Sequence, residues 1–353
     1  MASAKALNIM VLGGAGFIGR HAVAALLKQH YGVVVGSRHP ARVYRRLKEA
    51  TRHCECRQVR FEQLATAEMW IASLQGIDAV VNCVGILRER PGETYDAVHL
   101  RAPAALAQAC KQKGIRLIHV SALGLNHAHR SGFLRSKRAA EELLRDSGAD
   151  YCIVRPSLLD GQGGFGASWI RFLSSLPVHL MPYKAQGQIA ALDVEDLGEA
   201  LARLVEYQIA ATATAQDREF DLGGLQHRDL AGYMQSLRIA YIGKPALRIW
   251  VPNLLARLAS HVCDLLHFSP FSFGHWELLQ KDNLPGINRL PELLGRAPCS
   301  IGSTGAAGVG TRYSFNSVPI NQPQARNSCK FGGIARHQYC ALSQCDARNE
   351  EIK

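Results

Sequence analysis

The glycine-rich turn near the N-terminus constrains the fold more than any other feature of the sequence. Gly13, Gly16 and Gly19 follow an apolar run at 8–12 and open an amphipathic stretch at 17–30. In a dinucleotide-binding turn, the first glycine permits the sharp bend and the second lets the pyrophosphate approach the backbone. The third lets the helix pack closely on the sheet, and the helix N-terminus offers amide donors to the phosphates. A tight turn without a ligand is the alternative, and the strand–turn–helix context favours the dinucleotide. The residues expected to hold it here are Gly13, Ala15, Gly16, Phe17, Ile18 and Gly19.

Short apolar runs alternate with helical stretches from residue 7 to about residue 160. Strands are expected at 8–12, 33–36, 79–84, 116–121 and 150–155, with helices at 17–30, 103–113 and 136–147. Near-continuous apolar strands separated by helices indicate a parallel sheet that is buried on both faces. We therefore predict an α/β chain with a Rossmann-type doubly wound parallel sheet and a smaller C-terminal lobe.

The pattern divides the chain into three parts. Residues 1–160 are predicted as the NAD(P)-binding Rossmann domain, and 161–298 as a smaller substrate or partner lobe. That lobe is expected to hold helices at 194–207, 228–241 and 253–266 and a strand at 219–222. From about residue 299 the composition shifts to Gly, Ser, Asn and Gln with little periodicity, which predicts a poorly ordered tail over 299–353.

The end of the second predicted strand indicates which dinucleotide binds. NAD-preferring folds place a carboxylate there to hold the ribose 2′-hydroxyl, whereas this chain has Ser37 and Arg38. A guanidinium can hold a 2′-phosphate through paired hydrogen bonds. NADP(H) is therefore favoured over NAD(H), with the further basic residues at 42–60 interpreted as a solvated helix face.

Net charge and hydropathy limit the partners. Lys and Arg number 41 against 29 Asp and Glu, a formal charge of +12 that suits a nucleotide, a nucleic acid or an acidic membrane surface without choosing among them. We expect no nucleic-acid binding, because no basic and aromatic module accompanies the charge. No apolar run approaches the roughly 18–20 residues of a spanning helix, so the chain is not expected to be integral to a membrane. The glycines within the N-terminal apolar run favour a strand there over a signal peptide.

The cysteines predict neither disulfides nor a metal site. Three of the ten, Cys83, Cys110 and Cys152, lie within apolar stretches, where a free thiol behaves as a small hydrophobe. This usage indicates a reducing compartment. The sequence HCEC at 53–56 resembles a metal motif, but no second Cys/His pair lies nearby at a matching spacing, so no metal is expected.

Residues 249–268 leave two interpretations open. Apolar side chains recur there at helical spacing, interrupted by Pro252, with Arg257, His261 and His267 among them. A helix packed on the second lobe is favoured. The alternative is an amphipathic helix that contacts an anionic membrane or a partner subunit.

Segments at the predicted strand ends resemble extended and atypical short-chain dehydrogenases/reductases. Besides the glycine turn, these are 82–85 (NCVG), 119–121 (HVS), 155–157 (RPS) and 191–196 (ALDVED). More narrowly, four segments resemble the nucleotide-binding accessory subunit of respiratory complex I and its bacterial relatives. They are 85–87 (GIL), 133–137 (FLRSK), 269–271 (SPF) and 284–287 (LPGI). The resemblance covers roughly residues 7–298.

The resemblance implies a catalytic set that is incomplete in this chain. Active members of the superfamily use a Ser, a Tyr and a Lys four residues after the Tyr, with the Tyr transferring a proton to or from the substrate oxygen. Ser121 and Lys137 match, but Phe133 stands in the Tyr position and has no proton to give. Lys137 can still bind the nicotinamide ribose, with a surface lysine as the alternative, and Ser121 can equally be a strand end. The resemblance also places Val84, Gly85 and Pro156 at the cofactor.

Two further family contacts are altered. The Asp that often contacts the adenine has only Phe61 and Glu62 available near its position, and the Asn frequent in the central helix corresponds to His99.

Two functions remain open at this point. The favoured one is an NAD(P)H-binding accessory, assembly or sensing factor linked to respiratory complex I or quinone metabolism. The other is an active NADP-dependent reductase or nucleotide-sugar epimerase or dehydratase that uses another proton donor, such as His127, His129 or a water. The expected location is cytoplasmic, with attachment to a respiratory complex or the inner membrane surface, or the mitochondrial matrix if the source is eukaryotic.

Overall fold

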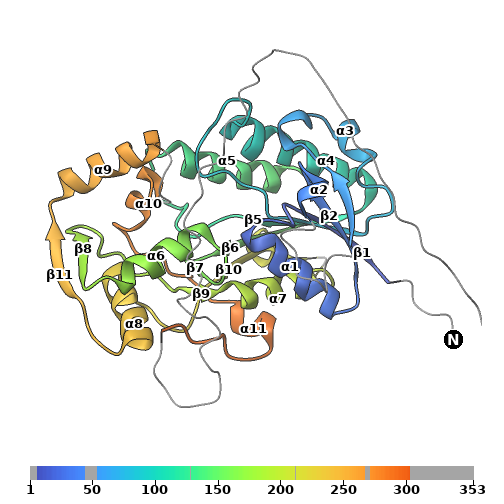
Figure 1. Cartoon of the computed structure of the whole chain (residues 1–353). Coiled ribbons are helices and arrows are strands. Elements are labelled where there is room, and N and C mark those ends of the chain that lie inside the picture. The colour runs from blue at the N-terminus through green and yellow to red at the C-terminus, as the bar shows by residue number, and fades with distance from the viewer. Residues whose placement is uncertain (1–5, 44–53, 128, 211, 267–270, 303–353) are drawn as a thin grey trace, which may run out of the picture. The chain divides into compact units, whose positions relative to one another are not determined.

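A seven-stranded parallel sheet forms the centre of the computed structural model (Figure 1). The structure describes residues 6–302 apart from 44–53, 128, 211 and 267–270. The strand order is β10-β6-β5-β4-β1-β2-β3, so the chain runs outward from β1 to one edge, then crosses back and runs to the other. The strands are β1 (Asn8–Leu12), β2 (Gly32–Ser37), β3 (Glu55–Gln58), β4 (Ala79–Asn82), β5 (Arg116–Val120), β6 (Tyr151–Pro156) and β10 (Glu219–Leu222).

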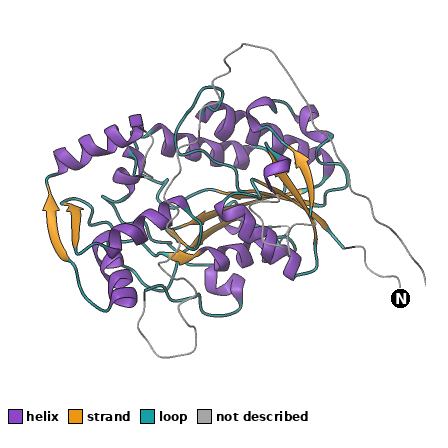
Figure 2. Ribbon diagram, viewed as in Figure 1, coloured by secondary structure: helices purple, strands orange, loops and turns teal. Residues whose placement is uncertain are grey.

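Helices cover both faces of this sheet, as Figure 2 shows. Alternate residues of a strand point to opposite faces. In β1, Ile9 and Val11 accordingly enter one apolar core, and Met10 and Leu12 enter the other. The first core is completed by α1 (Phe17–Lys28), α7 (Val194–Arg203) and α11 (Leu290–Leu294), and the second by α3 (Ala67–Ile71), α4 (Ala102–Lys113) and α5 (Gly132–Asp146). The predicted doubly wound sheet is confirmed.

The strand at 219–222 lies in a different place from the one expected. It was assigned to the second lobe, but β10 pairs with β6 as the edge strand of the central sheet, and Phe220 is buried. Helix α7 likewise packs on α1, where a Cβ on Gly198 would lie 2.7 Å from the backbone oxygen of His21. Residues beyond 160 therefore complete the sheet as well as building the lobe.

The remaining elements form the lobe and the short connections. A separate parallel pair, β8 (Val178–Pro182) with β11 (Leu247–Val251), leads into α9 (Asn253–Leu266). The lobe also holds α6 (Phe165–Ser175), α8 (Leu230–Ile242), α10 (Phe273–Leu278) and the paired β7 (Leu159–Asp160) and β9 (Leu192–Asp193). Short helical segments are α2 (Pro40–Val43), η2 (Phe61–Gln63), η3 (Asp96–Arg101) and η4 (Gln216–Arg218). Most of the predicted 299–353 tail lies outside the described residues.

Candidate functional site

The glycine turn lies between β1 and α1, at the carboxyl end of the central strand β1. Gly13 has a φ of +72°, which favours glycine, and its N–H donates to the Gly36 carbonyl oxygen at 3.0 Å. A Cβ on Gly19 would lie 2.3 Å from the Gly13 carbonyl oxygen, so this position admits no side chain. A Cβ on Gly16 would meet only that same oxygen, at 3.0 Å. The turn therefore keeps the space in front of the α1 N-terminus open, which is the geometry a pyrophosphate needs.

The other residues predicted in the turn differ in their surroundings. Ala15 and Ile18 are half-buried beside the first core. The Phe17 ring packs against the backbone of the lobe, because a Cβ on Gly164 would lie 2.7 Å from it. Phe17 therefore links the turn to the segment that precedes α6.

Arg38, at the end of β2, forms an ion pair with Glu93. A tight turn presents that carboxylate, since the backbones of Arg90 and Glu93 exchange two hydrogen bonds of 2.8 and 3.1 Å. The Ser37 hydroxyl accepts a hydrogen bond from the His39 N–H at 3.2 Å. Glu93 could not be predicted as the partner of Arg38, because nothing local connects two residues 55 positions apart.

Phe61 and Glu62 are the two residues near the position expected to contact the adenine. Phe61 is buried and packs edge-on against Trp70, with their ring centroids 5.2 Å apart. Its ring therefore belongs to the second core, and of the two candidates only Glu62 remains partly accessible.

Lys137 lies on α5 beside the loop that follows β4. Its Nζ lies 3.5 Å from the Val120 carbonyl oxygen, and a Cβ on Gly85 would lie 3.8 Å from the same Nζ. Burial lowers the pKa of Lys137 to about 8, although the nearby Glu141 and Cys83 oppose this shift. An ammonium in this position can donate to the hydroxyl groups of a ribose that lies over Gly85.

The loop at Val84 and Gly85 is held by two buried side chains. The Asn82 amide oxygen accepts from the Val84 N–H at 3.0 Å, and its Nδ2 lies 3.1 Å from His119 Nδ1. Since Nδ2 can only donate, His119 Nδ1 accepts and the ring proton sits on Nε2. Burial and the charge of Lys137 lower the pKa of His119 to about 3, so this imidazole is neutral at pH 7.

His99 connects the loop that follows β4 to Phe133. The Ile86 N–H donates to His99 Nε2 at 3.0 Å, which puts the ring proton on Nδ1, 2.8 Å from Ser136 Oγ. The Ser136 hydroxyl then donates to the Phe133 carbonyl oxygen at 2.9 Å. Burial first, then the charge of Lys137, and then repulsion from His119 once that ring is also protonated, lower the pKa of His99 to about 2. The single ring proton of the neutral His99 is therefore directed at Ser136.

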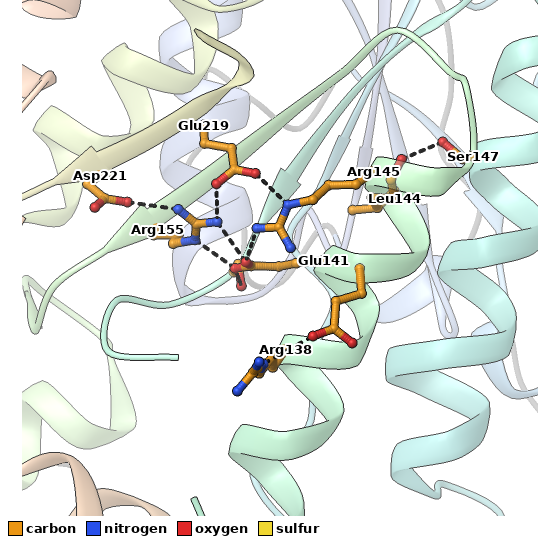
Figure 3. Close-up of polar contacts among 10 residues, drawn as sticks. Arg138, Glu141, Leu144, Arg145, Ser147, Arg155, Glu219 and Asp221 are labelled. Carbon is orange, nitrogen blue, oxygen red and sulfur yellow. Dashed lines mark hydrogen bonds and ion pairs between the residues drawn. The ribbon is translucent and has the colours of Figure 1, made fainter. Parts of the chain in front are cut away.

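Ser121 follows β5 and is engaged by a side chain of the protein. Its buried hydroxyl donates to Glu141 at 2.5 Å, within a charged network shown in Figure 3. Arg155 binds Glu141 at 2.7 and 2.9 Å and Glu219 at 2.5 Å, and Arg145 bridges the same two carboxylates. This network joins α5, β6 and β10. The Ser121 hydroxyl is thus bonded within the protein, and a substrate-orienting role for it stays a prediction.

Pro156 ends β6 directly beyond this network. It is buried and lies opposite Leu222 in the register of β6 and β10, and its carbonyl oxygen accepts from the Leu123 N–H at 3.2 Å. Pro156 is therefore part of the buried packing at the carboxyl end of β6.

Phe133 lines a cavity of about 420 Å³ between the Rossmann part and the lobe. Its ring lies 5.8 Å from Lys137 Nζ and 6.4 Å from the Tyr95 ring. The Tyr95 hydroxyl donates to the Leu87 carbonyl oxygen at 2.7 Å, and burial raises its pKa to about 12. The other lining residues come from the segment 87–95, the residues around the start of α5, α9 and the residues around the start of α10: Leu87, Arg88, Glu89, Tyr95, Arg130, Ser131, Gly132, His261, Asp264, Ser272, Phe273 and Gly274.

Neither histidine suggested as a substitute proton donor lines this cavity. His129 Nε2 lies 2.6 Å from the Gly124 carbonyl oxygen, and the His127 ring packs edge-on against the His129 ring.

The described residues include no cluster of three or more His, Cys, Asp or Glu side chains arranged for a metal ion. In the 53–56 motif, the Cys56 thiol donates to the Cys54 carbonyl oxygen at 3.6 Å, whereas His53 lies outside the described residues. No helix in the described part of the chain is long and apolar enough to cross a bilayer.

The turn and the sheet define the class of protein: residues 13–168 match the family model described as NAD(P)H-binding. Over this domain the chain is similar to NAD(P)H-binding proteins. Solved structures share its fold. A dTDP-glucose 4,6-dehydratase from Bacillus anthracis in complex with NAD is 16% identical with a TM-score of 0.61, over 84% of this chain and 93% of that one. A UDP-glucose 4-epimerase from Thermotoga maritima is also 16% identical, with a TM-score of 0.58 over 83% and 94%.

Curated relatives are distant in sequence. Ceramide reductase of Caulobacter vibrioides is 27% identical over 200 residues, covering 56% of this chain and 60% of that protein. NADH dehydrogenase [ubiquinone] 1 alpha subcomplex subunit 9, mitochondrial, of Dictyostelium discoideum is 28% identical over 197 residues, covering 56% and 54%. The chain therefore spans a little over half the length of these relatives. The predicted resemblance to the complex I subunit is confirmed as distant homology.

Proposed function

We propose that this protein binds NADP(H) as an accessory, assembly or sensing factor in respiratory-chain or quinone metabolism, and does not turn the cofactor over. The observation that carries the proposal is Phe133, one helical turn before Lys137, where active relatives need a proton donor. Ser121 supports it, since its hydroxyl is bonded to Glu141 at 2.5 Å. The similarity to a complex I subunit supplies the metabolic setting.

The cofactor residues proposed are the glycine turn, Ser37 and Arg38 for the adenosine phosphate, and Lys137 with Gly85 for the nicotinamide ribose. Attachment to a respiratory complex or to a membrane surface belongs to the same proposal, and so does a location in the cytoplasm or in the mitochondrial matrix.

The second candidate is an NADP-dependent reductase. Two observations favour it: a cavity of about 420 Å³ adjoins Phe133, and burial lowers the pKa of Lys137 to about 8. An amine with that pKa can exchange protons near neutral pH. The similarity to a ceramide reductase gives this candidate a relative with a reductase name.

Native mass spectrometry of the purified chain tests binding, with co-purified NADP(H) as the expected result. Turnover is tested by NADPH oxidation with carbonyl substrates in the wild type, in Phe133→Tyr and in Lys137→Met. The accessory role requires negligible turnover in all three and equal NADPH affinity in the first two. Wild-type oxidation of NADPH that Lys137→Met abolishes would establish the reductase instead.

A further inference from the structure

The leucine side chains of helix α9 are exposed to solvent. Its inward face consists of the buried Ala256, Ser260 and Cys263, which repeat at i, i+4 and i+7. Leu254 and Leu265 are 77% and 78% exposed. A helix on the surface of a globular protein normally does the reverse and buries its apolar stripe. The large apolar side chains on the exposed face, here called the outer face, are Leu254, Leu255, Leu258, Val262, Leu265 and Leu266.

The strand pair before α9 extends this apolar surface. Partners in a parallel pair share one side, and Leu247 with Ile249 therefore lie beside Val178 and Leu180. All four side chains are exposed, Leu247 and Leu180 by 64% and 63%. Figure 1 shows β8, β11 and α9 together at one end of the described molecule.

A hydrogen bond fixes the strand pair to the helix. The Lys184 N–H, just beyond β8, donates to the Asn253 side chain at the start of α9, at 2.9 Å. The strand pair is thus tied to the start of the helix, and both expose several large apolar side chains where soluble proteins usually expose isolated ones.

The exposed charged side chains on the segments that form this surface are basic. The segments 165–184 and 239–266 contain a single acidic residue, Asp264. Its carboxylate is bonded to Arg88 at 2.7 Å and to the Phe273 N–H at 2.8 Å. The exposed charged side chains of these segments are basic: Lys184, Lys244, Arg248 and Arg257.

We propose that the outer face of α9, flanked by the β8–β11 pair, docks on the surface of an anionic lipid bilayer. Leucines with basic residues beside them are the composition of an interfacial helix, and each cation near an anionic surface strengthens the attachment. A second copy of this chain is a poorer occupant. A symmetric dimer through this surface would bring the same cations face to face.

The inference deepens the membrane attachment named under the proposed function and is independent of nucleotide binding. Because His261 and Asp264 of α9 also line the cavity beside Phe133, docking brings that cavity to the lipid surface.

Vesicle flotation of the full chain tests the proposal, with phosphatidylcholine vesicles and vesicles containing one quarter phosphatidylglycerol. We expect flotation with the anionic vesicles, at least tenfold stronger than with neutral ones and reduced by 0.5 M salt. Leu254→Asp/Leu258→Asp should lower the apparent affinity at least tenfold, because charged side chains then face the acyl region. Arg248→Glu/Arg257→Glu should lower it by a similar factor on anionic vesicles only.

Ile287→Asp is the matched control, since this side chain is 80% exposed but lies before α11. It should float as the wild type does. Equal flotation of the wild type and the leucine variant would overturn the proposal, and so would no flotation of the wild type. A dimer in sedimentation that only the leucine variant abolishes would assign the surface to a second copy instead.

Calorimetry with NADPH on the same proteins separates the two proposals. Unchanged NADPH affinity in the leucine variant shows that its fold is intact. A wild type that floats but does not bind NADPH would contradict the proposed function alone.

Discussion

Two buried, neutral histidines should make the fold sensitive to mild acid. His99 and His119 are 4% and 5% exposed, and burial lowers their pKa values to about 2 and about 3. An unfolded histidine has a pKa near 6.5, so the unfolded state gains protons below that pH while the folded state does not. Their contribution to stability is complete above pH 6.5 and is lost as the pH falls toward the folded values.

The magnitude follows from the titration curves. Between pH 7 and pH 5 each histidine should remove about 2 kcal/mol of unfolding free energy, or about 4 kcal/mol for the pair. Asp193 acts in the opposite sense, because burial raises its pKa to about 6 in the folded state. It gains protons on folding and restores about 1 kcal/mol over the same interval. The expected net loss is about 3 kcal/mol.

Urea unfolding at pH 7 and pH 5 measures this loss directly. His119→Gln should reduce it by about 2 kcal/mol, whatever the stability of the variant at pH 7, since only the difference between the two pH values is compared. His227→Gln, at an exposed position, is the control and should leave the loss unchanged. A loss that is equal in wild type and His119→Gln would refute the assignment of a buried, neutral imidazole.

Three further outcomes are expected. Arg38→Ala should lower the affinity for NADPH about tenfold and leave the affinity for NADH unchanged. Glu93→Gln should raise the affinity for NADPH, because it frees the Arg38 guanidinium. Calorimetry with both cofactors measures these affinities. The Gly19→Val variant should not fold, since its Cβ would lie 2.3 Å from a backbone oxygen. The Gly16→Val variant should fold but no longer bind NADPH. Glu141→Ala should cost about 3 kcal/mol in urea unfolding, because it leaves two arginines without their buried carboxylate.

Much of the sheet could be predicted from the sequence because its strands are apolar on both faces. The predicted strands at 8–12 and 116–121 agree with β1 and β5 to within a residue, and α9 begins and ends where expected. These signals are local: an apolar run, a glycine turn, a helical period. Helix ends were less accurate, as in α7, which stops at Arg203 instead of continuing to 207.

The features that sequence reasoning missed all depend on partners distant in the chain. The β8–β11 pair joins residues about 70 positions apart, and its strands are too exposed to stand out as buried apolar runs. The Arg38–Glu93 pair and the contact of Ser121 with Glu141 are equally non-local. Composition and period carry no information about such pairs, so the candidate residues could be named while the direction of their side chains could not.

The polar groups around Phe133 explain why a tyrosine there should not be enough to restore chemistry. The Ser121 hydroxyl is bonded to Glu141, and the donors of His99 and Ser136 lead in sequence to the Phe133 carbonyl oxygen. A new phenol would gain the neighbouring Lys137 ammonium but no hydroxyl that orients a substrate. Phenylalanine and tyrosine differ by one oxygen, a small change in volume, whereas these hydrogen bonds commit three side chains to contacts within the protein. Catalytic activity in a Phe133→Tyr variant would therefore also require the release of Ser121 from Glu141. That release would disrupt the network that joins α5 to β6 and β10.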